Sequence, residues 1–105
     1  MFTRDFKETV AVRAAADGAF ARALLDEALV LFLNGEPDTA KLILRDLVNA
    51  TLGFEGLAVE VQRPSKSLHR MLSVSGNPTM DNLSAIFASL QKALGVQLKA
   101  SFEAA

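Results

Sequence analysis

The sequence contains no cysteine. This absence excludes disulfide bonds, thiolate metal ligands and a cysteine nucleophile, and it is typical of a protein of the reducing cytosol. Histidine is almost as scarce, because His69 is the single one, which is too few for a histidine-rich zinc site. We therefore expect neither a metal nor any other cofactor.

Long apolar runs are also missing. The longest, ALVLFL at residues 28–33, is far shorter than the roughly 20 residues that a membrane-spanning helix needs. The first ten residues, MFTRDFKETV, are charged and lack the apolar segment of a signal peptide. These features predict a soluble, cytoplasmic protein with no membrane partner.

Positive charge is not in excess either. The chain has 105 residues and a formal net charge of −1, which fits one globular domain and argues against indiscriminate binding to nucleic acid. Acids are absent, however, from Val61 to Met80, where there are three Lys or Arg. A surface that contacts a polyanion needs such a carboxylate-free face, but short helices with a few basic residues are also common on ordinary protein surfaces.

The spacing of apolar residues predicts an all-α fold of short helices. We expect a first helix from Asp5 to about Ala16, then Asp17 as the N-cap of an apolar helix that ends at Asn34-Gly35. A further helix begins near Asp38 and ends at Gly53, with Leu44, Leu47, Val48 and Thr51 on its core face and Lys41, Arg45, Asp46 and Asn49 outside.

Two more helices follow a short apolar segment, FEGLAVEV. Pro64 suits the first turn of a helix, in which Leu68, Met71 and Leu72 fall at the i, i+3, i+4 spacing of a core face. Lys66, Ser67, His69 and Arg70 then lie outside. After the turn SVSGNPT, Thr79 is a natural N-cap for the last helix, which Gly95 ends, with Leu83, Ile86, Phe87, Leu90 and Leu94 on its core face.

The spacing of the apolar residues changes after Gly95. Val96, Leu98, Ala100 and Phe102 alternate with polar residues, which predicts a β-strand. A single strand needs a partner, either the N-terminal segment or a second copy of the chain, so this tail is one candidate for a dimer interface. The other is the apolar helix ALLDEALVLFL. We expect one domain over residues 1–105: helices to residue 36, a bundle over 37–95, and a strand and tail over 96–105.

Residues 53–96 resemble the helix-turn-helix of Xre-type regulators, and more closely the probable addiction-module antidote proteins, the HigA-like antitoxins. The matching features, in chain order, are Leu57-Ala58, Ser65-Lys66-Ser67-Leu68, Met71-Leu72, Gly76-Asn77-Pro78-Thr79 and Leu94-Gly95-Val96. The resemblance extends from about Asp38 to Phe102. It implies a lambda-repressor-like helical bundle.

The resemblance also implies a function: a homodimer that binds double-stranded operator DNA in its own promoter and neutralises a RelE- or HigB-like toxin. The recognition helix would be Ser65 to Leu72. The residues expected at the DNA are Ser65, Lys66, Ser67, His69 and Arg70 on that helix, Arg63 before it, and Asn77 and Thr79 after it.

Two residues depart from the pattern of the relatives. Gln62 occupies a left-handed turn position that usually carries Gly, and Phe54 replaces a Gln that touches phosphate. Two alternatives therefore stay open, a free-standing regulator without a toxin and an interaction module that has lost DNA binding. Catalysis is not expected, because Ser65 and His69 share a helix face without an identifiable third group.

Overall fold

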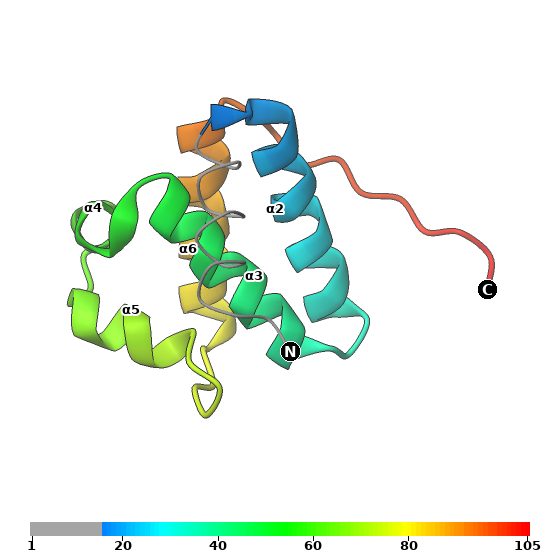
Figure 1. Ribbon diagram of the computed structural model, residues 1–105. Helices are drawn as coiled ribbons and strands as arrows, with labels where there is room; N and C mark the ends of the chain where they lie inside the picture. The colour runs from blue at the N-terminus through cyan, green and yellow to red at the C-terminus, as the bar shows by residue number, and fades with distance from the viewer. Residues whose placement is uncertain (1–15) are drawn as a thin grey trace.

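The computed structural model describes residues 16–105, so nearly all of the helix expected from Asp5 to Ala16 lies outside the described residues. The described part is all-helical, which confirms the predicted class (Figure 1). None of its helices has the length and apolar character needed to cross a membrane. The helices are α2 (Gly18–Leu33), α3 (Pro37–Ala50), α4 (Gly53–Val61), α5 (Ser65–Met71) and α6 (Met80–Leu94).

Helix α2 begins and ends where the sequence predicts. The Asp17 carboxylate accepts hydrogen bonds from the backbone N–H groups of Ala19 (3.0 Å) and Phe20 (3.2 Å), which satisfies donors that a helix start leaves unpaired. At the other end, Gly35 adopts the left-handed conformation with φ of 84°. The Asp17 cap at the start and the left-handed Gly35 after the end thus set the length of α2.

Helix α3 lies against α2 and contributes several fully buried side chains to the core. Leu44, Leu47 and Val48 are fully buried, as predicted. The helix ends at Ala50, before the predicted stop at Gly53, and Gly53 instead begins α4 with φ of 69°. The segment FEGLAVEV is therefore a helix of its own.

Lys41 corrects the predicted outer face of α3. Its side chain is buried, and its Nζ donates to the backbone carbonyl oxygens of Gly76 (2.7 Å) and Val74 (3.2 Å). The Asp38 carboxylate lies 3.4 Å from the same nitrogen. Three oxygens thus compensate the burial of this charge, and they attach the loop between α5 and α6 to α3.

The core is a single cluster to which every described helix contributes. Phe32 of α2 meets Phe87 of α6 edge-to-face, with ring centroids 5.9 Å apart. The buried residues of the cluster are Ala21, Leu25, Ala28, Leu44, Leu47, Val48, Phe54, Leu57, Leu68, Leu72, Ile86, Phe87 and Leu90. Leu83 and Leu94 pack against it from the predicted face of α6.

Helix α6 also has the predicted ends, and the segment after it is irregular. The Thr79 hydroxyl accepts a hydrogen bond from the backbone N–H of Asn82 (3.2 Å), and Gly95 is left-handed with φ of 65°. Residues 96–105 form neither helix nor strand in the single chain, so the predicted strand is not present there. This tail leaves the helical body on the side away from α5 (Figure 1).

Replacing Lys41 with Met should destabilise the protein. Lys41→Met keeps much of the buried volume but leaves the carbonyls of Val74 and Gly76 without their donor. We expect the free energy of unfolding to fall by about 1–3 kcal/mol, measured by urea denaturation. Lys92→Met is the matched control, because the Lys92 side chain is 78% exposed. An equally large loss in both variants would contradict the anchoring role.

Candidate nucleic-acid interface

A left-handed residue connects α4 to α5. Gln62 has φ of 55° and ψ of 49°, and it is the one non-glycine residue with positive φ in residues 16–105. The backbone N–H groups of Gln62 and Arg63 both point to the carbonyl of Ala58, the latter at 3.3 Å. The chain reverses within three residues, so α5 begins immediately at Pro64-Ser65.

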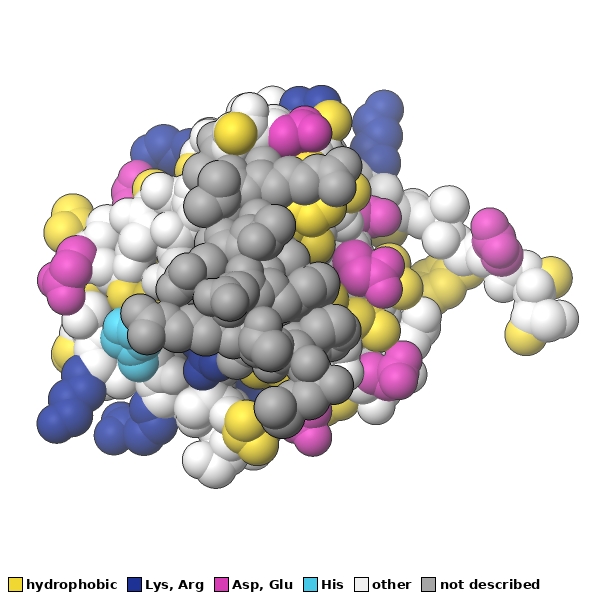
Figure 2. All heavy atoms as spheres, viewed as in Figure 1, with side chains coloured by type: hydrophobic (Ala, Val, Ile, Leu, Met, Phe, Trp, Pro, Cys, Tyr) yellow, Lys and Arg dark blue, Asp and Glu magenta, His cyan; other side chains and the backbone are white. Residues whose placement is uncertain are grey.

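Helix α5 has a buried side and an exposed side, as its spacing predicts. Leu68 and the following Leu72 are buried, while Lys66, His69 and Arg70 are exposed. Figure 2 shows basic side chains and the histidine gathered over this part of the molecule. Burial of the two leucines therefore determines that the basic face points to solvent.

His69 lies on an aromatic ring. Its imidazole stacks on Phe54 of α4 with ring centroids 3.8 Å apart and an angle of 20° between the planes. Phe54 itself is only 5% exposed, so it is a fixed part of the core. The contact covers one face of the imidazole, while the residue as a whole stays exposed. The histidine is thus oriented by packing, which the sequence spacing did not reveal.

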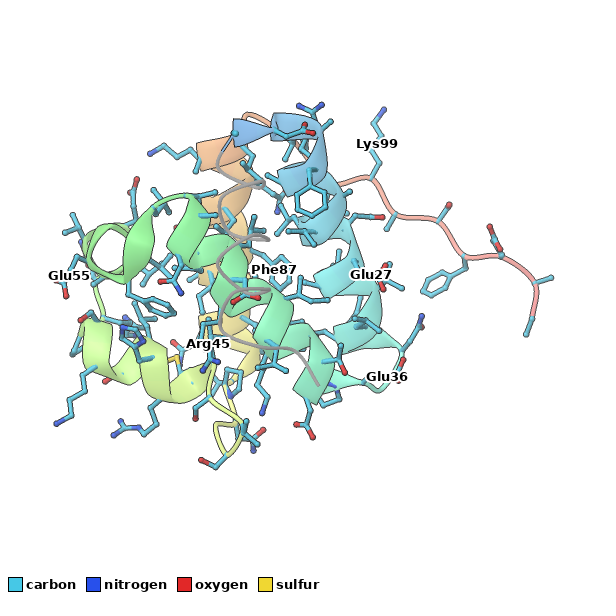
Figure 3. All side chains as sticks on the ribbon, in the orientation of Figure 1. Glu27, Glu36, Arg45, Glu55, Phe87 and Lys99 are labelled. Carbon is cyan, nitrogen blue, oxygen red and sulfur yellow. The ribbon has the colours of Figure 1, made fainter. Side chains whose placement is uncertain are left out.

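A carboxylate of α4 contacts residues 61–80, the segment that has no Asp or Glu in the sequence. The Ser65 hydroxyl donates to Glu55 Oε1 of α4 at 2.9 Å. Glu55 is seen at the side of the molecule where α4 and α5 meet (Figure 3). The first turn of α5 is therefore not free of negative charge in space, although residues 61–80 lack acids in the sequence. The hydroxyl of Ser65 points to this carboxylate, and no bond joins it to His69 among the described residues.

Two of the flanking candidates have structural contacts. The Arg63 guanidinium donates to Asn82 Oδ1 (3.3 Å) and to the carbonyls of Gln62 (3.2 Å) and Val61 (3.4 Å). Thr79 caps α6 through the backbone of the same Asn82. Arg63 therefore folds back over the α4–α5 turn and joins it to the start of α6.

Asn77 lies in the loop that follows α5. The loop packs tightly there, because a Cβ added to Gly76 would lie 2.0 Å from the carbonyl oxygen of Arg70. Asn77 is exposed. The structure thus brings the eight candidates to α5 and its two flanking segments. No group of three or more His, Cys, Asp or Glu among the described residues is arranged to hold a metal ion.

Comparison of the chain with protein-family models, with curated protein sequences and with solved structures gives no match. The geometry of α4 and α5 and the sequence pattern are therefore the two indications of a function.

Replacing Gln62 with Gly should stabilise the protein. A side chain in the left-handed region costs about 1 kcal/mol, which glycine avoids. We expect Gln62→Gly to raise the free energy of unfolding by up to about that amount, measured by urea denaturation. Gln97→Gly, the same change in the irregular tail, should have little effect. A decrease for Gln62→Gly would show that the Gln62 side chain itself stabilises the turn.

Proposed function

We propose that this protein is a sequence-specific regulator of transcription that binds double-stranded DNA through α4 and α5. In this arrangement α4 and α5 form a helix-turn-helix, and α5 is the recognition helix. The observation that carries the proposal is the exposed face of α5, where Lys66, His69 and Arg70 lie opposite the buried leucines. A convex basic helix of this kind fits the major groove.

The exposed residues suit different parts of the DNA. Lys66 and Arg70 carry charges that neutralise phosphates and release counterions. Ser67 and His69 offer uncharged or weakly basic groups that can hydrogen-bond to base edges. The stack on Phe54 gives His69 a defined orientation, which a contact to a particular base requires. Phosphate binding would supply most of the affinity, and His69 part of the specificity.

The biological role in the proposal comes from the sequence pattern. The resemblance to HigA-like antitoxins supports a homodimer that represses its own promoter and binds a RelE- or HigB-like toxin. Mixing the protein with the product of the neighbouring gene tests this part: a stable complex with a small basic RelE-like protein supports the antitoxin role. A neighbour of unrelated type, together with specific DNA binding, would favour a free-standing regulator.

A second candidate function is that of an interaction module without DNA binding. Two observations favour it: Glu55 places a carboxylate at the first turn of α5, and Phe54 is buried where the relatives present a phosphate-binding Gln. A phosphate approaching Ser65 would meet that negative charge at close range. The two candidates differ in one measurable property, the dependence of DNA affinity on the cations of α5.

The first experiment measures binding to DNA from directly upstream of the gene. We expect fluorescence anisotropy to show tighter binding to this duplex than to a scrambled one, and weaker binding as salt rises. The double variant Lys66→Ala/Arg70→Ala should lose roughly tenfold or more in affinity. Its slope of log affinity against log salt should decrease by about two, because each contact contributes about one.

The matched control is Lys92→Ala, which removes one exposed cation from α6. Lys66→Ala alone and Arg70→Ala alone complete the series, so that variants with the same change in charge are compared. Equal weak binding to both duplexes, with no effect of the α5 substitutions, would contradict the proposal and support the interaction module.

The His69–Phe54 contact generates a separate prediction about specificity. His69→Ala should lower the ratio of specific to scrambled-duplex affinity by about tenfold, the order expected for one lost base contact. It should leave the salt dependence nearly unchanged. Phe54→Leu keeps an apolar side chain in the core but removes the stacked ring, so the same ratio should fall. An unaltered ratio in both variants would show that His69 makes no contact to a base.

A further inference from the structure

An apolar groove lies where α2, α6 and the start of the tail meet. Its volume is about 410 Å³. Its apolar lining comes from Leu25 and Leu29 of α2, from Phe87 of α6, and from Val96 and Leu98 at the start of the tail. Arg22 and Lys99 are among its polar lining residues. Figure 3 shows Lys99 where the tail passes the helices.

The tail is fixed at its base and unpaired beyond it. The backbone N–H of Leu98 donates to Gln91 Oε1 at 2.9 Å, which attaches this residue to α6. Beyond Leu98, no backbone group of the tail has a hydrogen-bond partner among residues 16–105. Its apolar side chains are also uncovered, since Leu98 is 44% exposed and Phe102 is fully exposed. An extended edge of this kind can pair with another strand.

We propose that the tails of two copies of this chain pair as antiparallel strands and that each copy inserts its Phe102 into the α2–α6 groove of the other. The inference deepens the homodimer part of the proposed function and rests on it. Pairing supplies the hydrogen bonds that the tail lacks, and insertion covers an aromatic ring and an apolar groove together. Each chain carries both a tail with Phe102 and a groove. A two-fold axis between two copies therefore pairs the two tails and fills the two grooves at once.

The alternation of apolar residues and the charges of the tail together favour one register. In an antiparallel pair with Ala100 opposite the partner's Ala100, Leu98 lies opposite the partner's Phe102, so all the apolar side chains share one face. Because Leu98 also borders the groove, this pairing brings the partner's Phe102 to it. On the other face, Lys99 lies opposite the partner's Ser101, and its two diagonal neighbours are the partner's Glu103 and the partner's Lys99. A register with Lys99 opposite the partner's Lys99 would instead place the two like charges directly opposite each other and is less favourable.

The dimer leaves the proposed DNA-binding face free. The tail and α5 lie on opposite sides of the helical body (Figure 1). A partner that pairs with the tail therefore does not cover Lys66, His69 or Arg70. Because the two surfaces are separate, a substitution that abolishes dimerisation need not alter the proposed DNA-binding face, and each can be tested alone.

Sedimentation of the whole chain without DNA tests the interface. We expect wild type to sediment as a dimer, and Leu98→Asp/Phe102→Asp to raise the dimer dissociation constant at least about tenfold, because two apolar side chains lose their cover. Ser101→Asp/Ala105→Asp adds the same two charges to the opposite face of the same tail, at residues that do not line the groove. It should stay close to wild type.

Three outcomes would overturn the proposal. A monomeric wild type at high micromolar concentration would show that the tail lies in its own groove or serves a different partner. A dimer unaffected by either pair of substitutions would place the interface elsewhere, and equal losses in both would deny the role of the apolar face. Specific DNA binding that persists in the monomeric variant would leave the proposed function standing without the dimer.

Cross-linking tests the register, since the chain has no native cysteine. In the proposed pair the two copies of residue 100 are direct neighbours, so Ala100→Cys should form a disulfide-linked dimer readily. The two copies of residue 97 would lie six residues apart along the ladder, roughly 20 Å. Gln97→Cys should therefore cross-link much more slowly, and equal rates would exclude this register.

Discussion

The burial of Leu68 and Leu72 is the constraint on which the surface chemistry depends. Both leucines belong to the same buried cluster as Leu57 of α4, so α5 cannot rotate about its axis without exposing them. The direction of the basic face follows from that insertion. A helix of seven residues has little stability alone, and its conformation comes from this packing. The proposed DNA contacts are thus a consequence of core packing.

The loop after α5 is held by a second constraint, the buried ammonium of Lys41. This group satisfies two loop carbonyls, and Asp38 partly compensates its charge. The tight approach of Gly76 to Arg70 closes the same loop from the other side. Together they determine where α6 begins relative to α5. Arg63 and Asn82 connect the opposite end of α5 to α6, so both ends of this short helix are fixed.

Apart from α4, the described helices could be predicted from the sequence because their signals are local. Asp17, Thr79 and Gly95 act within a few residues of their own positions, and the spacing of Leu68 and Leu72 sets a face without reference to the rest of the chain. The candidate site was only partly predictable, because its decisive contacts join distant residues. Lys41 was expected outside because α3 alone cannot show that a loop 33 residues later covers it. Glu55 and Phe54 likewise reach α5 only through the fold.

The exposed cations of α5 and the exposed apolar groups of the tail lie on two different surfaces of the protein. The exposed cations of α5 would be costly to cover with an apolar partner, whereas the exposed Phe102 gains from being covered. Glu55 limits the positive face at the first turn of α5, so a polyanion would be contacted most favourably from Lys66 onward. This asymmetry favours base contacts from the middle of α5, where His69 is oriented by Phe54. Phe54 thereby has a role that its place in the core alone does not reveal, that of supporting the histidine.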